Sequence, residues 1–254
     1  MLGLEAMSET APPTAAMLVI GDEILSGRTK DRNIGFVADT LTDIGIDLEE
    51  ARIVADREAA IVGAVRELSA RYDFVFTSGG IGPTHDDITA DAIAKAFNLP
   101  IDIDQRAVDL LLPFWASRGI EPNEARLRMA RIPEGARLIR NAVSAAPGFA
   151  VGNVFVMAGV PSILQAMMDE VVKMLPAARP VLSETIEAHR GEGDIAAPAA
   201  AVQAAHPEVR IGSYPYHDGQ RFTTRLVLRS RDAEVLARAR AAMEQALAAG
   251  GHGE

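Results

Sequence analysis

The chain has 254 residues, of which 48% are hydrophobic and 24% charged, so it can bury the core of one large domain with or without a smaller companion. A formal net charge of −10 and an aromatic content of 5% argue against a nucleic-acid partner, which needs a basic surface or stacking rings. The chain contains no cysteine, which excludes disulfides, thiolate catalysis and cysteine-ligated metal sites.

The N-terminal segment differs from a targeting signal. Residues 1–16 lack the basic start and the apolar stretch of a signal peptide, and their small residues and paired prolines predict a disordered tail. No apolar run reaches the roughly 18 residues that span a bilayer, so no membrane partner is expected. These features favour a cytoplasmic protein.

Residues 17–178 alternate short apolar strands with amphipathic helices. Such alternation predicts an α/β fold in which a mostly parallel sheet is covered by helices on both faces. The strands are predicted at 16–21, 46–54, 72–78, 136–141 and 149–159, and the helices at 33–45, 58–72, 89–97, 104–119, 122–133 and 160–176.

Three details of this domain are expected. The strand at 46–54 has a charged middle, which favours a place near the edge of the sheet. Pro113 should kink or break its helix. Residues 149–159 can form a hairpin around Gly152 and Asn153.

The pattern changes near residue 178. Residues 179–250 read as strand, helix, strand, strand and helix, which predicts a small α+β domain of order β-α-β-β-α.

A glycine loop follows the strand at 72–78 and precedes a helix. Gly79, Gly80 and Gly82 let the backbone approach a ligand, and the free N–H groups of a helix start attract anions. The loop is neither of the two standard nucleotide loops, because Thr84-His85-Asp86 stands where a P-loop has Gly-Lys-Ser/Thr and His85 stands where the dinucleotide fingerprint has its third glycine.

Two adjacent carboxylates, Asp86 and Asp87, end this loop. One Asp is explained as a cap of the following helix, but two in a row are explained better by a bound cation. Divalent ions such as Mg²⁺ bind through one or two carboxylates together with substrate phosphates. The pair therefore predicts a divalent metal, Mg²⁺, Mn²⁺ or Co²⁺, at this loop.

Three other polar clusters also follow strands. Ligands of parallel sheets bind at the carboxyl ends of the strands, so these clusters can meet the glycine loop in one crevice. Arg28, Lys30 and Arg32 can clamp phosphates, although a solvated loop explains each of them alone. The candidate site residues of the clusters are Asp22, Ser26, Asn33, Asp56, Gly159, Pro161 and Ser162, of which Asn33 and Asp56 can also be helix N-caps.

The order of these motifs resembles the molybdopterin-binding domain family, which includes the MoaB/Mog-like adenylyltransferases, the domain attached to eukaryotic FAD synthases and the N-terminal domain of CinA, the competence/damage-inducible protein. The strongest matches are TSGGIGPTHDDIT (77–89) and the CinA-type opening GDEILSGRTKDRN (21–33), together with APGF (146–149) and GVPS (159–162). The segment IGSYP (211–215) is similar to the CinA branch. The amidase domain of full CinA proteins is not expected here.

The resemblance implies a three-layer α/β/α fold with a nucleotide or pterin site at the glycine loop. It implies that Asp87 serves metal binding and catalysis, that Asp56 is a second functional acid, and that Thr84 and the residues of the opening motif contact the ligand. Ala158, Ser144 and Ala145 depart from the family pattern close to the expected ligand.

Three functions remain open. The CinA branch implies a metal-dependent pyrophosphatase acting on an ADP-ribose-like or flavin dinucleotide. The adenylyltransferases imply adenylyl transfer to molybdopterin. The departures also allow a non-catalytic module that binds a pterin or nucleotide. Relatives are often oligomeric, so a homo-oligomer is expected.

Overall fold

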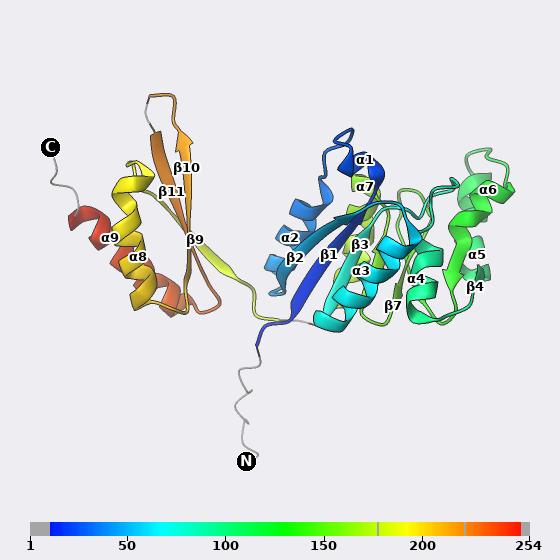
Figure 1. The fold of residues 1–254 in the computed structure, drawn as a ribbon, viewed down its shortest axis with the longest axis horizontal. Coiled ribbons are helices and arrows are strands. Elements are labelled where there is room, and N and C mark those ends of the chain that lie inside the picture. Colours follow the sequence, from blue (N-terminus) through cyan, green and yellow to red (C-terminus); the bar gives the residue numbers. More distant parts are fainter. Residues whose placement is uncertain (1–10, 177, 221, 250–254) are drawn as a thin grey trace, which may run out of the picture. The chain divides into compact units, whose positions relative to one another are not determined.

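The computed structural model describes residues 11–176, 178–220 and 222–249, and the chain divides into two compact units, 1–178 and 179–254 (Figure 1). Most of the predicted N-terminal tail lies outside the described residues. Its last part is not a tail, because strand β1 already begins at Thr14, where Thr14 and Asp73 join the starts of β1 and β3 through a hydrogen bond of 2.8 Å. None of the described helices is both long and apolar enough to cross a membrane.

The first unit is built on a six-stranded sheet of order β2-β1-β3-β8-β7-β6. Strands β2, β1, β3 and β8 run parallel, and only β7, which pairs antiparallel with both β8 and β6, runs the other way, so the predicted mostly parallel α/β fold is confirmed. The bounds are β1 Thr14–Ile20, β2 Asp47–Val54, β3 Phe74–Ser78, β6 Arg137–Ile139, β7 Gly148–Val151 and β8 Val154–Met157. The predicted hairpin is β7–β8, and β2 does lie at the edge of the sheet.

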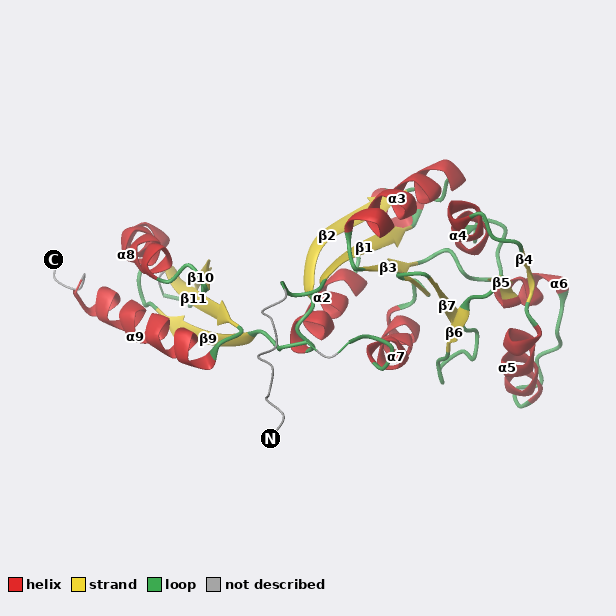
Figure 2. Ribbon diagram, turned by 90° about the horizontal axis from the view of Figure 1, so that it is seen from below, coloured by secondary structure: helices red, strands yellow, loops and turns green. Residues whose placement is uncertain are grey.

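Alternate side chains of β1 enter two separate cores. Leu18 and Ile20 pack with the helices α3 (Glu58–Arg71), α4 (Thr89–Phe97) and α5 (Gln105–Ala116). Met17 and Val19 pack with α2 (Asn33–Asp43) and α7 (Pro161–Val172) on the opposite face. Figure 2 shows α3 and α4 on one side of the sheet and α2 and α7 on the other. A strand buried on both faces needs the continuous apolar sequence that β1 has.

The structure differs from the local predictions at four places. Helix α5 continues through Pro113, whose exposed position leaves the unpaired carbonyl one turn earlier accessible to water. The helix predicted at 122–133 is only α6 (Glu124–Leu127) followed by one 3-10 turn (Arg128–Ala130), because the next residues form β5 (Arg131–Pro133). This strand pairs with the unpredicted β4 (Ile101–Ile103). The opening motif also contains a one-turn helix, α1 (Asp22–Leu25).

The second unit has the predicted order of elements. Strands β9 (Leu182–Glu187), β10 (Arg210–His217) and β11 (Phe222–Ser230) form an antiparallel sheet of order β10-β11-β9. Helices α8 (Glu192–Ala205) and α9 (Ala233–Ala249) supply the rest of its own core, in which Ile195, Leu226, Leu228 and Met243 are buried.

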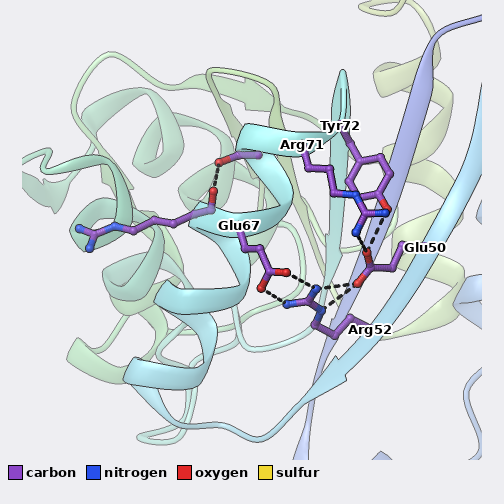
Figure 3. Close-up of polar contacts among 7 residues, drawn as sticks. Glu50, Arg52, Glu67, Arg71 and Tyr72 are labelled. Carbon is purple, nitrogen blue, oxygen red and sulfur yellow. Dashed lines mark hydrogen bonds and ion pairs between the residues drawn. The ribbon is translucent and has the colours of Figure 1, made fainter.

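Charged residues tie the edge strand β2 to α3. Arg52 binds both Glu50 and Glu67 at 2.7 Å, and the Tyr72 hydroxyl donates to Glu50 at 2.9 Å (Figure 3). The hydrogen bonds from Arg52 and Tyr72 lower the pKa of Glu50. Charged side chains on an edge strand also oppose pairing with another chain.

Tyr72→Phe tests this cluster. Tyr72 is 5% exposed, so the loss of its hydrogen bond to Glu50 should cost about 0.5–1.5 kcal/mol of unfolding free energy, measured by denaturant titration at pH 7. The pKa of Glu50 is lowered in the folded state. Ionised Glu50 therefore adds to the unfolding free energy at pH values above its ordinary pKa of 4.5, and this contribution is lost as the pH falls through the folded pKa. The cost should therefore shrink in acid. A cost that stays constant across this range would contradict the assignment to ionised Glu50.

Candidate functional site

The predicted polar clusters converge at one edge of the sheet. Strands β2, β1, β3 and β8 are parallel neighbours, so their carboxyl ends and the four loops that follow them lie together. The loops after β1 and β3 approach closely, since a Cβ built at Gly79 would lie 2.2 Å from the carbonyl oxygen of Ile20. The loop after β8 meets the same point, with Gly159 next to Gly79.

The three glycines of the loop after β3 lie against other parts of the chain, and the backbone of two of them favours glycine. Gly79 and Gly80 have φ of 109° and 69°, which favours glycine. A side chain at Gly80 would clash with the Thr89 hydroxyl at 2.1 Å, and one at Gly82 would lie 2.6 Å from the Asp87 carboxylate. The backbone thus folds tightly around the start of α4.

This loop leaves amide groups available to a ligand. Within the described chain, the N–H groups of Gly80, Ile81 and Gly82 donate to no backbone or side-chain acceptor, whereas Thr84 N–H and Oγ1 donate to Asp87 at 2.8 and 2.5 Å. The Asp87 carboxylate therefore fixes the conformation of its own loop by binding Thr84. Unpaired amides before a helix are a usual anion-binding arrangement.

Asn33 joins three of the loops. Its side-chain amide donates to Ser78 Oγ at 2.7 Å and to the carbonyl oxygen of Gly159 at 2.8 Å, and the residue is 5% exposed. Asn33 is the first residue of α2 and not its N-cap, a position held by Arg32 without a side-chain bond. The geometry thus makes Asn33 a connector between the ends of β3 and β8, and Ser78 is a partner that the sequence analysis did not identify.

Carboxylates gather around Asp56. Its Oδ2 accepts a hydrogen bond of 2.8 Å from the backbone N–H of Asp22, so it links the loops after β2 and β1, while Arg57 occupies the N-cap of α3. Burial, followed by repulsion from Glu23, Asp22 and Asp86, raises the pKa of Asp56, although the Asp22 N–H opposes this.

These charges are not neutralised by the protein. No Arg or Lys in the described residues forms an ion pair with Asp22, Glu23, Asp56, Asp86 or Asp87. The described ranges also contain no group of three or more His, Cys, Asp or Glu side chains placed to hold a metal by itself. The carboxylate oxygens have the chemistry that a hard divalent cation prefers, but further ligands have to come from a bound molecule or water.

Asp56→Asn tests the repulsion at this cluster. The amide can still accept the Asp22 N–H, while the charge is removed. The pKa of Asp56 is raised in the folded state. Ionisation of Asp56 therefore lowers the unfolding free energy of the wild type as the pH rises from the ordinary value of 3.8 through the folded pKa. Asp56 is only partly buried, so solvent screening limits the effect, and the variant should exceed the wild-type melting temperature by about 1–2 °C at pH 7 and by less at pH 4. A difference that does not vary with pH would contradict this origin.

Other predicted site residues lie at the rim of the crevice. Ser26 is exposed and its hydroxyl donates to Glu23 O at 3.3 Å, while Ser162 is exposed on the first turn of α7 and Pro161 is the first residue of that helix. The basic residues Arg28, Lys30 and Arg32 are all exposed.

A hollow beside the glycine loop contains residues that the sequence analysis did not select. It is lined by Gly80, Gly82 and Asp87 and, from elsewhere in the chain, by Arg128 and Phe149. Arg128 sits in a segment that the sequence pattern predicts as ordinary helix, so its proximity to the loop had no local signal.

Comparison with known proteins agrees with this architecture. Residues 16–179 match the family described as probable molybdopterin binding domain, and residues 180–252 match FAD synthase, middle domain. A protein of Archaeoglobus fulgidus is 33% identical over 199 residues, which cover 78% of this chain and 84% of that protein.

Two relatives with informative descriptions are longer than this chain. A CinA-like protein of Myxococcus xanthus is 33% identical over 77% of this chain and 50% of that protein, and a probable FAD synthase of Caenorhabditis briggsae is 32% identical over 92% and 49%. The crystal structure of the protein CinA, with unknown function, from Thermoplasma acidophilum superposes with a TM-score of 0.59 and 34% identity over 64% of this chain and 98% of that one. The chain therefore belongs to the molybdopterin-binding domain family, in its MoaB/Mog-like, CinA-type form.

Proposed function

We propose that this protein is a metal-dependent pyrophosphatase that cleaves an ADP-ribose-like or flavin dinucleotide at the glycine loop. The observation that carries the proposal is that loop amides without an acceptor and carboxylates without an ion-pair partner, both among the described residues, lie side by side. The amides suit the oxygens of a diphosphate, and the carboxylates suit a divalent cation shared with it.

The residues have separate roles in this proposal. The N–H groups of Gly80, Ile81 and Gly82 bind phosphate oxygens and stabilise the negative charge that develops on them. Asp87 and Asp86 hold the cation, and Asp56 contributes a further negative charge. A divalent cation bound there would neutralise the diphosphate and favour attack by water. Asn33 holds the loops after β3 and β8 together through its two hydrogen bonds.

The proposed reaction consumes one water molecule. Its oxygen forms a bond to one phosphorus, the bond from that phosphorus to the bridging oxygen breaks, and the proton leaves to solvent. ADP-ribose would yield AMP and ribose 5-phosphate. The resemblance of residues 180–252 to the FAD synthase middle domain supports including FAD among the candidate substrates.

The test is turnover of ADP-ribose, FAD and ATP by purified protein with Mg²⁺, Mn²⁺ or Co²⁺ and with a chelator, followed by chromatography of the products. AMP released from a dinucleotide only in the presence of metal is the expected result. Absence of hydrolysis under all conditions would refute the pyrophosphatase.

A second candidate is adenylyl transfer to a pterin phosphate, which the description of the matching family favours. The same amides and carboxylates would serve it: an oxygen of the pterin phosphate, in place of water, would attack the α-phosphorus of ATP, and pyrophosphate would leave. Incubation with molybdopterin and ATP separates the two, since a transferase forms an adenylylated pterin. Tight binding without any product would instead indicate a non-catalytic binding module.

A further inference from the structure

The hollow beside the glycine loop borders a wider groove. The groove has a volume of about 500 Å³ and is lined by β4, α6 and the residues after α6. Arg128, Arg131 and Asp91 line both spaces. These three residues therefore separate the glycine loop from the groove, and a ligand that occupies both has to cross them. A volume of this size lies in the range of small-molecule sites.

Arg128 lies between the hollow and the groove, and not all of its N–H groups have an acceptor in the protein. Its Nη2 donates weakly to the backbone oxygen of Asp87 at 3.4 Å, and its Nε is buried with no partner among the described residues. Arg131, by contrast, is held by the Asp91 carboxylate. A buried guanidinium N–H without an acceptor is costly, and a phosphate accepts two such bonds at once.

The groove beyond Arg128 has a mixed lining. Asp102 and Glu124 present carboxylates, which accept hydrogen bonds from hydroxyl groups, while Ile103 and Leu127 present apolar surface. Ile103 is 48% exposed, so its side chain offers apolar surface to a molecule in the groove. Acceptors beside apolar contacts suit a sugar ring, whose hydroxyls donate and whose carbon face is apolar. The two carboxylates disfavour another phosphate at this end.

We infer that the groove is a second subsite, which binds the sugar attached to the far phosphate of a diphosphate-linked ligand, and that Arg128 binds the phosphate between the loop and the groove. This inference rests on the proposed function, because it needs the diphosphate at the glycine loop. It adds a requirement for a sugar on the far side, so that a bare diphosphate occupies only part of the site.

The inference is tested by calorimetric binding with Mg²⁺ present. The probes are methylene-bridged ADP-ribose, which cannot be hydrolysed at its diphosphate, and methylenediphosphonate, which lacks both sugars. The variants are Arg128→Ala, which removes the phosphate contact, and Ile103→Trp, which fills the groove. Arg126→Ala is the matched control, because Arg126 lies in α6, two residues before Arg128, and its side chain donates to Glu121 O, outside the groove.

Ile103→Trp should lower the affinity for the ADP-ribose analogue by about 10-fold or more and change the affinity for methylenediphosphonate by less than about 2-fold. Arg128→Ala should lower the affinity for the analogue by a similar factor. Arg126→Ala should leave the affinities for both probes unchanged. Ile103 is exposed enough for this variant to fold even if Arg128→Ala does not, as a thermal melt will show.

The two levels of the proposal fail differently. If the wild-type protein binds neither probe, the proposed function is wrong and the subsite falls with it. If the wild-type protein binds both probes and folded Ile103→Trp binds the analogue equally well, the second subsite alone is wrong.

Discussion

Replacing Asp87 with Asn is expected to lower the turnover number for metal-dependent hydrolysis by about 100-fold or more while the fold is retained. The reason is that the amide oxygen of Asn can still accept the hydrogen bonds from Thr84 N–H and Oγ1, so the loop stays closed. Only the negative charge is lost. The measurement is kcat for release of AMP from ADP-ribose, together with a thermal melt of both proteins.

Two further variants make this result specific. Asp39→Asn removes the same charge from an exposed position on α2 and should leave turnover unchanged. Asp87→Ala removes the loop hydrogen bonds as well, so it should lower the unfolding free energy by about 1–2 kcal/mol. Turnover of Asp87→Asn equal to that of the wild type would show that the carboxylate has no part in the chemistry.

Gly79→Ala is expected to destabilise the first unit by about 3 kcal/mol or more. Gly79 has φ of 109°, and an added Cβ would lie 2.2 Å from the carbonyl oxygen of Ile20. Because this contact is with backbone, no side-chain rotation can relieve it, and the loops after β1 and β3 have to separate. Denaturant unfolding gives the change in unfolding free energy. The affinity for phosphate should fall as well, because the loop that binds it is displaced.

Gly63→Ala is the matched control for this substitution. Gly63 lies in the interior of α3, and an added Cβ has nothing within 4 Å. Alanine favours a helix over glycine, so this variant should be more stable by about 0.5–1 kcal/mol. Equal effects of the two substitutions would mean that the close approach of Gly79 to Ile20 does not constrain the site.

Much of the fold could be predicted from local patterns. The continuous apolar run of β1 identifies a doubly covered strand, and the spacing of Val37 and Leu41 identifies the buried face of α2. These signals are reliable because burial imposes a period on the sequence of each element. The pairing of β4 with β5 could not be predicted in this way, since strands of three residues carry no period and depend on their partner.

The candidate site was also only partly predictable from the sequence. The types and order of its residues, from Asp22 to Gly159, were visible in the sequence because each motif follows a strand. The roles of Asn33 and Asp56 were not, because both were consistent with helix caps. Only the assembled loops show that Asn33 binds Ser78 and that Asp56 binds the Asp22 backbone.

The sequence by itself determined the α/β class, the family and the edge of the sheet where the polar residues gather, because parallel strands place the loops at their carboxyl ends together. The tertiary structure decided which loop atoms remain free to bind a ligand and which are used within the protein. It also decided that Arg128, 41 residues from Asp87 in the chain, lies beside the glycine loop. Hydrogen-bond partners and close approaches of this kind depend on distances between segments that are remote in sequence, and no local pattern of residues encodes such distances.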